Sequence, residues 1–297
     1  MEVLRNFLAE LANSGILPEF FAYGFVVNSL IAAILIGPML GGIGTMVVIK
    51  KMAFFSESIG HAAIAGISIG ILLGEPYNSP YIMLFSYCII FGLIINYTRN
   101  RTKMGTDTLI GIFLSISIAL GAILLIYISG KVNSHMLETV FFGSILTVSD
   151  FDLTVLLFTN ITLIILIMLW YNKMLLSSFN KNISIVKNVN VVFLEYVFIL
   201  IITIITVASV KIIGAALVEA LLIIPAAAAK NLSKSIKQFI LQSIVFSTIS
   251  CLLGIIVPLL LSLSLPSGPA IILVASTIFF VTMIIKNVMK KYKEGVM

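Results

Sequence analysis

A carboxylate and an imidazole lie four residues apart within an apolar part of the sequence. Glu57 and His61 occur in FFSESIGHAA, residues 54–63, where the neighbours are mostly small or hydrophobic. If this stretch is helical, the spacing places both side chains on one helix face, one turn apart. Both groups are ligands for zinc, manganese and iron, so the pair predicts a site for a divalent cation. A hydrogen-bonded pair with a purely structural role is the alternative.

The composition indicates which elements must position this pair. Of the 297 residues, 60% are hydrophobic and 10% are charged, whereas soluble domains have about 25% charged residues. Apolar runs of about 20 residues are long enough to cross a membrane as helices. We predict an all-α polytopic membrane protein, a single transmembrane domain over residues 1–297, with nine apolar runs at 22–48, 53–74, 81–97, 108–129, 152–171, 191–210, 212–229, 239–264 and 269–287. Because little more than Lys211 separates the sixth run from the seventh, eight spans also fit the pattern.

The distribution of basic residues predicts the orientation of the chain. Cytoplasmic loops hold most of the Lys and Arg residues of a membrane protein. If nine spans alternate, 15 of the 18 basic residues lie on one side, and only Arg5, Lys131 and Lys211 lie on the other. We therefore expect the N-terminus outside the cell and the C-terminus in the cytoplasm. The net charge of +6 then reflects topology and contact with lipid, and we expect no nucleic-acid partner.

Other features limit the classes of function. Residues 1–20 lack the basic start and the cleavage site of a secretory signal, so we interpret them as a retained segment at the extracytoplasmic surface. The sequence contains no Gly-x-x-x-x-Gly-Lys-Ser/Thr phosphate-binding loop, so work driven by ATP must come from another polypeptide and no enzymatic activity is expected here. Cys88 and Cys251 lie within apolar runs, as buried unpaired cysteines do.

A third charged residue is predicted at a similar depth in the membrane. A charge at the bilayer centre costs about 2.5–3.5 kcal/mol, so it usually faces a partner or a water-filled path. Counted from Lys51 at 1.5 Å per residue, Glu57 lies about 9 Å and His61 about 15 Å from the cytoplasmic surface. Counted back from Lys230, Glu219 lies at about 16 Å. Glu219 could be a third ligand or a counter-charge, and an interhelical hydrogen bond is the structural alternative.

His135 is a further candidate on the extracytoplasmic side. It lies in KVNSHMLETVFFGS, in the loop expected after the fourth span. Imidazole could help to receive a cation there. A histidine without a function in an exposed loop is the commoner case.

The segment 212–238, IIGAALVEALLIIPAAAAKNLSKSIKQ, combines Pro225, four alanines and a basic run. We interpret it as a helix that breaks and turns along the membrane surface. Lys230, Lys234 and Lys237 share one helix face at spacings of four and three. Such a face could dock another protein or bind lipid headgroups, and periodicity does not distinguish the two.

Ordered blocks of sequence carry a family resemblance over nearly the whole chain. The chain resembles the membrane permease subunit of bacterial ABC importers for zinc, manganese or iron, the metal-chelate-type permeases. The blocks that carry the resemblance are VVIKKMAFFSESIGHAAIAGISIG, DTLIGIFLSISIALG, HMLETVFFGSILTVS, IIGAALVEALLIIPAAAAKNL and PSGPAIILVASTIFF.

The resemblance implies a role for several residues. The metal-coordinating acid and histidine of the family match Glu57 and His61, although the acid is usually Asp. At the position of Glu219 the family usually has a small or apolar residue, so the resemblance implies no role for Glu219. The basic segment 229–238 matches the coupling helix that receives the motion of the ATPase, and its residues there are Lys230, Asn231, Lys234 and Lys237.

The resemblance also implies an assembly and a substrate. It implies a permease homodimer, two cytoplasmic ATPase subunits and an extracytoplasmic metal-binding protein that delivers the ion. Zinc, manganese or iron would be the transported substrate, and no permanently bound cofactor is expected. The rival hypothesis is a proton-coupled secondary cation carrier that uses Glu57, His61 and Glu219 without an ATPase partner, because intramembrane acids and histidines also form proton relays.

Overall fold

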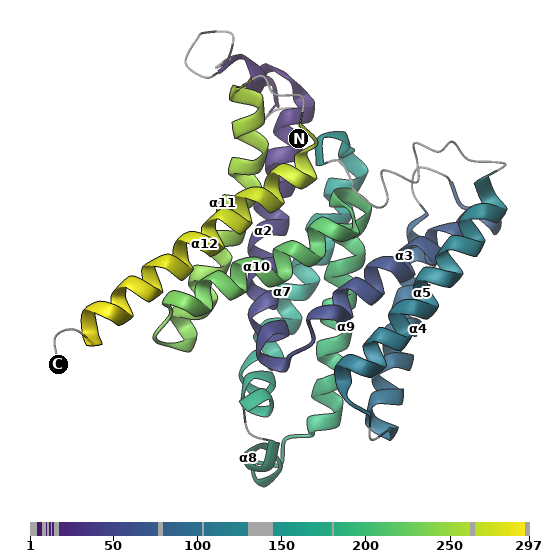
Figure 1. Ribbon diagram of the computed structural model, residues 1–297. Coiled ribbons are helices and arrows are strands. Elements are labelled where there is room, and N and C mark those ends of the chain that lie inside the picture. The colour runs from purple at the N-terminus through teal and green to yellow at the C-terminus, as the bar shows by residue number, and fades with distance from the viewer. Residues whose placement is uncertain are drawn as a thin grey trace. The chain divides into compact units, whose positions relative to one another are not determined.

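The computed structural model describes residues 5–7, 10, 12, 14, 18–76, 80–102, 104–129, 145–179, 181–261 and 265–294. Within these ranges the structure consists of helices and contains no strand (Figure 1). The elements are η1 (Glu19–Ala22), α2 (Gly24–Lys50), α3 (Ala53–Leu72), α4 (Tyr81–Arg101), α5 (Thr106–Ser129), η2 (Ile145–Thr147), α7 (Asp150–Phe179), α8 (Lys181–Val186), α9 (Val191–Ile213), α10 (Ala215–Leu232), α11 (Ile236–Leu260) and α12 (Ser267–Glu294).

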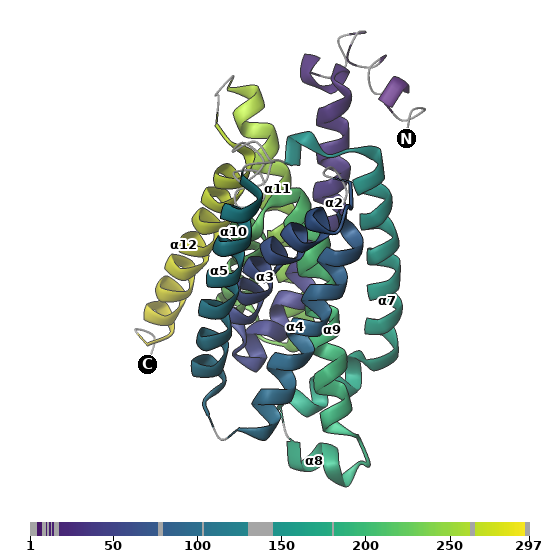
Figure 2. The same cartoon turned by 90° about the vertical axis from the view of Figure 1, so that its right-hand side faces the viewer.

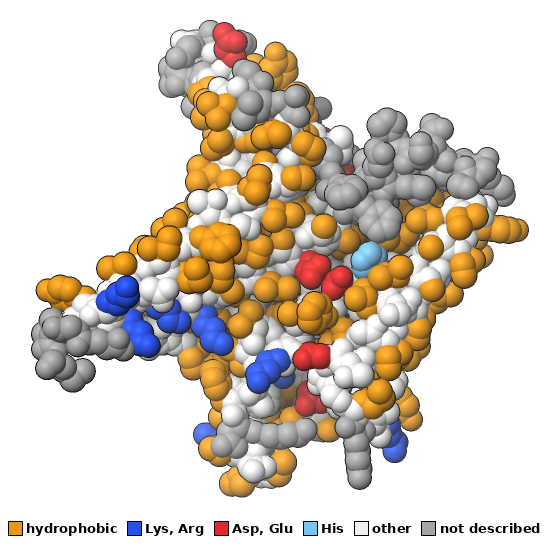
Figure 3. Space-filling model, viewed as in Figure 1, with side chains coloured by type: hydrophobic (Ala, Val, Ile, Leu, Met, Phe, Trp, Pro, Cys, Tyr) orange, Lys and Arg blue, Asp and Glu red, His pale blue; other side chains and the backbone are white. Residues whose placement is uncertain are grey.

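Nine of the described helices are long and apolar enough to cross a membrane. They are α2–α5, α7 and α9–α12. Many large hydrophobic side chains on these helices face outward, as Figure 3 shows for one face. The prediction of an all-α polytopic membrane protein is therefore confirmed, with nine candidate spans.

The boundary between the sixth and seventh spans lies at Gly214, a few residues after the expected position at Lys211. Helix α9 continues through Lys211 to Ile213 and ends at Gly214, which has φ +82°. Glycine adopts positive φ at little cost because it has no β-carbon. The Nζ of Lys211 lies 4.5 Å from the ring centroid of Tyr81, and this cation–π contact accommodates the charge at the end of the helix.

The break expected near Pro225 lies further along the chain. Helix α10 contains Pro225 and continues to Leu232, and α11 begins at Ile236 with Ser235 as its N-cap. Alanine has the highest helix propensity, so Ala226–Ala229 favour continuation after the proline. The segment 229–238 is therefore the end of α10, a short connection and the first turn of α11, and it forms no separate helix.

The chain divides into two compact units, each assembled from segments that are distant in sequence. Unit 1 comprises Met1–Thr45, Ser144–Phe158 and Ala220–Met297. Unit 2 comprises Met46–Gly143 and Thr159–Glu219. Helices α2, α7 and α10 each contribute residues to both units.

In unit 2, α3 packs against α4, α5 and α9 (Figures 1 and 2). The Ser58 hydroxyl of α3 donates a hydrogen bond to the Ile110 carbonyl of α5 at 3.2 Å. On α4, a β-carbon at Gly92 would lie 2.8 Å from Oγ1 of Thr203 on α9, so the glycine lets the two helices pack closely at this point. The neighbours of α3 thus hold the helix that carries Glu57 and His61.

In unit 1, α2 packs closely against α11 and α10. A β-carbon at Gly41 would lie 2.6 Å from the Ser243 carbonyl oxygen, and one at Gly44 would overlap the Leu222 carbonyl. The Ser243 hydroxyl donates a hydrogen bond to the Gly41 carbonyl at 2.6 Å. Small residues at helix contacts let backbones approach one another in membranes, where packing replaces the hydrophobic effect as the driving force.

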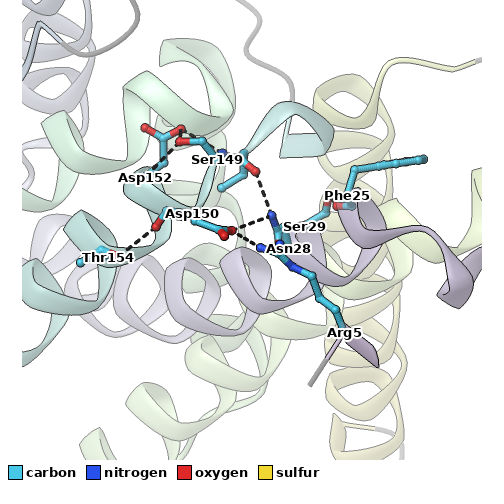
Figure 4. A network of polar contacts seen from close by, with 9 residues as sticks. Arg5, Phe25, Asn28, Ser29, Ser149, Asp150, Asp152 and Thr154 are labelled. Atoms are coloured by element: carbon cyan, nitrogen blue, oxygen red, sulfur yellow. Dashed lines mark hydrogen bonds and ion pairs between the residues drawn. The ribbon is translucent and has the colours of Figure 1, made fainter. Parts of the chain in front are cut away.

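A polar network in unit 1 joins the N-terminal segment to the starts of α2 and α7 (Figure 4). Nε of Arg5 donates to Oδ1 of Asn28 at 3.0 Å, and the Arg5 guanidinium forms an ion pair with Asp150. The Asn28 side-chain amide also donates to the Val148 carbonyl at 3.1 Å. The N-terminal segment, the start of α2 and the start of α7 are therefore linked, although they are far apart in sequence.

Candidate metal site

Glu57 and His61 lie on one face of α3, as their spacing predicts. Helix α3 is continuous from Ala53 to Leu72, so residues four apart are one turn apart. Both side chains are half-buried, whereas the residues between them, Ser58 to Gly60, are buried. The charge of Glu57 acts on the His61 imidazole, so the two groups are electrostatically coupled. This face is therefore partly accessible on a helix that is otherwise mostly buried.

Small residues from two other helices surround this edge. A β-carbon at Gly60 would lie 3.1 Å from Cβ of Ala215 on α10, and one at Gly121 of α5 would lie 3.7 Å from the His61 carbonyl oxygen. Sequence reasoning did not single out Gly60 or Gly121. The sequence does give one indication for Gly60. A glycine within a helix destabilises that helix by about 1 kcal/mol relative to alanine, so a glycine next to the histidine suggests a close packing contact.

Glu219 lies near the pair. It is half-buried and lies four residues after Ala215, on the same face of α10. Because Ala215 packs on Gly60, α10 approaches α3 close to the pair, and the charge of Glu57 also acts on the Glu219 carboxylate. Figure 3 shows acidic side chains and a histidine next to one another among hydrophobic side chains.

These three side chains do not form a closed metal cage. Among the described residues, no three His, Cys, Asp or Glu side chains lie close enough together to hold a metal ion. The Glu57–His61 pair therefore offers two protein ligands and leaves other coordination positions open. A closed tetrahedral set is typical of structural zinc sites, whereas open sites exchange their remaining ligands.

The other predicted residues lie elsewhere. His135 falls outside the described residues. Cys88 and Cys251 are free and buried. Lys230 and Asn231 end α10, Lys234 lies in the connection, and Lys237 lies in the first turn of α11.

The basic segment is joined to α12 by side-chain contacts. Nδ2 of Asn231 donates to Oγ1 of Thr282 at 3.4 Å, and Nζ of Lys286 donates to Oδ1 of Asn231 at 3.4 Å. Lys and Arg side chains gather over α10 and α12 (Figure 3). Lys230, Lys234 and Lys237 are exposed, as a docking surface requires.

Comparison with known proteins defines the class to which this bundle belongs. The model of the ABC 3 transport family matches residues 22–286. Over 259 residues the chain is 30% identical to "Manganese transport system membrane protein MntC" of Listeria innocua, which covers 87% of this chain and 90% of that protein. It is 27% identical over 252 residues to "High-affinity zinc uptake system membrane protein ZnuB" of Buchnera aphidicola, covering 85% and 94% of the two chains.

A solved structure has the same fold. "PsaBC from Streptococcus pneumoniae in complex with Fab" superposes with a TM-score of 0.76 at 28% identity, covering 88% of this chain and 91% of that one. The fold is thus that of a polytopic ABC transporter permease, and the resemblance inferred from the sequence blocks is confirmed. The protein belongs to the ABC 3 transport family.

Proposed function

We propose that this chain is the permease subunit of an importer that moves a divalent transition-metal cation into the bacterial cytoplasm. The observation that carries the proposal is the half-buried Glu57–His61 pair, one turn apart on α3 in a membrane-spanning helix. Relatives over nearly the whole length are named as manganese and zinc transport proteins, which supports a cation of this class.

The pair acts as a transient site for the substrate. The Glu57 carboxylate and a ring nitrogen of His61 replace part of the hydration shell of the cation. Two protein ligands hold the cation less tightly than a closed cage does, so the cation can leave when the helices rearrange. His135 is a candidate first contact on the extracytoplasmic side.

The assembly that we propose follows the family. ATP hydrolysis takes place on separate cytoplasmic ATPase subunits, which dock on the segment 229–238 through Lys230, Asn231, Lys234 and Lys237. An extracytoplasmic protein delivers the metal, and two copies of this chain form the permease. The C-terminus faces the cytoplasm, in agreement with the excess of basic residues on that side.

Uptake of manganese and zinc by cells that lack other importers tests the function. His61→Ala should abolish uptake, and Glu57→Gln should reduce it strongly. Asp107→Asn removes an exposed carboxylate at the start of α5 and is the matched control. Undiminished uptake by a His61→Ala variant that reaches the membrane contradicts the proposed site.

A second measurement distinguishes ATP hydrolysis from a proton gradient as the energy source for transport. Inside-out membrane vesicles that contain the whole transporter should export the cation from their lumen only when ATP is supplied. Transport driven by a pH gradient without ATP would support the proton-coupled carrier instead. Membership of the ABC 3 transport family favours the first outcome.

A further inference from the structure

Glu219 is a second carboxylate beside the Glu57–His61 pair. It is half-buried, and no hydrogen bond or ion pair joins its carboxylate to another described residue. The contact between Gly60 and Ala215 fixes the start of α10, within unit 2, against α3 one turn away from Glu219. The position of Glu219 therefore follows from packing, and no basic partner among the described residues compensates its charge.

The proximity of the two carboxylates is unfavourable without a cation. The charge of Glu57 acts on Glu219, and like charges repel more strongly where little water screens them. In membrane-spanning helices each such charge already costs about 2.5–3.5 kcal/mol. A divalent cation held at Glu57 and His61 removes the repulsion, because it attracts both carboxylates.

We propose that Glu219 is a specificity-determining residue that favours Mn²⁺ over Zn²⁺ at the Glu57–His61 pair. The inference rests on the proposed function and assigns the substrate preference of the same site. Glu219 acts on the hydrated cation, through a bound water and through its charge, because the three side chains do not converge on one point.

The chemistry of the donor groups gives the direction of the preference. Carboxylate and water oxygens suit Mn²⁺, whereas imidazole nitrogen suits Zn²⁺ among other metals. Zn²⁺ also favours four ligands in a tetrahedron, which leaves little room for additional bound water. A second carboxylate that contacts the water shell thus stabilises Mn²⁺ more than Zn²⁺.

Equilibrium binding of Mn²⁺ and of Zn²⁺ to the purified full-length chain tests this inference. Glu219→Gln removes the charge and keeps the shape of the side chain, and it should weaken Mn²⁺ binding about 10–100-fold, as loss of an outer-shell partner does. Zn²⁺ binding should weaken by a clearly smaller factor. Unchanged Mn²⁺ binding, or an equal loss for both ions, overturns the proposal.

Four further variants keep the test decisive. Glu219→Asp retains the charge and should keep the preference for Mn²⁺, whereas Asp107→Asn removes an exposed charge and should change neither affinity. If the Gln variant does not fold, as judged by gel filtration, Glu219→Ser takes its place with the same expected result. Loss of binding in His61→Ala with no effect of Glu219→Gln would overturn only this inference, whereas unchanged binding in both variants would contradict the proposed function itself.

Discussion

Gly60 of α3 lies against Ala215 of α10, at a distance where a β-carbon on residue 60 would be 3.1 Å from the alanine Cβ. This contact brings together the two helices that carry Glu57, His61 and Glu219. This is closer than most pairs of β-carbons come, so a side chain at residue 60 would push Ala215 away from α3.

Substitution of Gly60 should separate α3 from the first turn of α10, Ala215 to Glu219. Gly60→Val should lower the free energy of unfolding by about 1–3 kcal/mol, the usual effect of overpacking, and should weaken metal binding as well. Gly111→Val is the matched control, because a β-carbon at Gly111 on α5 has nothing within 4 Å. Thermal unfolding in detergent and metal binding measure both effects. Equal behaviour of the two variants would show that the close contact has no role.

The packing of α2 in unit 1 gives a second matched pair. Gly44→Ala places a methyl group onto the Leu222 carbonyl, whereas the same change at Gly42 meets only side-chain carbons of Ile244 at 3.6 Å. We expect Gly44→Ala to lower the unfolding midpoint markedly and Gly42→Ala to have little effect. Thermal unfolding of both variants in the same detergent checks this. A Gly44→Ala variant as stable as the unmodified protein would contradict the close packing of α2 on α10.

An ion pair joins α4 to α9 in unit 2. Nη2 of Arg99 lies 3.1 Å from Oε2 of Glu195, and the side chains are 16% and 15% exposed. Arg99→Met removes this partner from a largely buried carboxylate. It should lower the free energy of unfolding by about 1–3 kcal/mol. Arg101→Met, which removes only an exposed contact 5.6 Å from the Tyr97 ring centroid, should cost less than about 1 kcal/mol.

A double variant in which the two charges are exchanged tests whether Arg99 and Glu195 interact directly. Arg99→Glu combined with Glu195→Arg should recover part of the stability that either single change removes. A double variant that is less stable than both single variants would argue against a direct interaction.

The orientation of the chain can be measured without removing native thiols, because Cys88 and Cys251 are buried. Leu73, at the end of α3, and Met104, between α4 and α5, are both exposed. A membrane-impermeant maleimide should label Leu73→Cys in intact cells and label Met104→Cys only after the membrane is opened. The reverse pattern would contradict the orientation derived from the basic residues.

The sequence predicts the helices well because each span must satisfy its backbone hydrogen bonds internally over a fixed membrane thickness. The run 53–74 corresponds to α3, Ala53–Leu72, and the run 191–210 to α9, Val191–Ile213. The boundary expected at Lys211 was misplaced because the ring of Tyr81 accommodates the lysine, a contact between residues that are distant in sequence. Pro225 likewise remains inside α10, although proline removes one backbone donor.

The candidate site was predictable only in part. The spacing of Glu57 and His61 follows from helix geometry alone. The proximity of Glu219 depends on the contact between Gly60 and Ala215, and depth counted along each helix gives no information about which faces meet. The ion pair of Arg99 with Glu195 was missed for the same reason.

Magnetic resonance of bound Mn²⁺ tests the central claim most directly, because the chain has two histidines. Full-length protein without a histidine tag should bind Mn²⁺ and show magnetic coupling of the ion to an imidazole ¹⁴N nucleus. We predict that this coupling disappears in His61→Gln and persists in His135→Gln. Coupling that persists in His61→Gln, or that is lost only in His135→Gln, would contradict a cation site on α3.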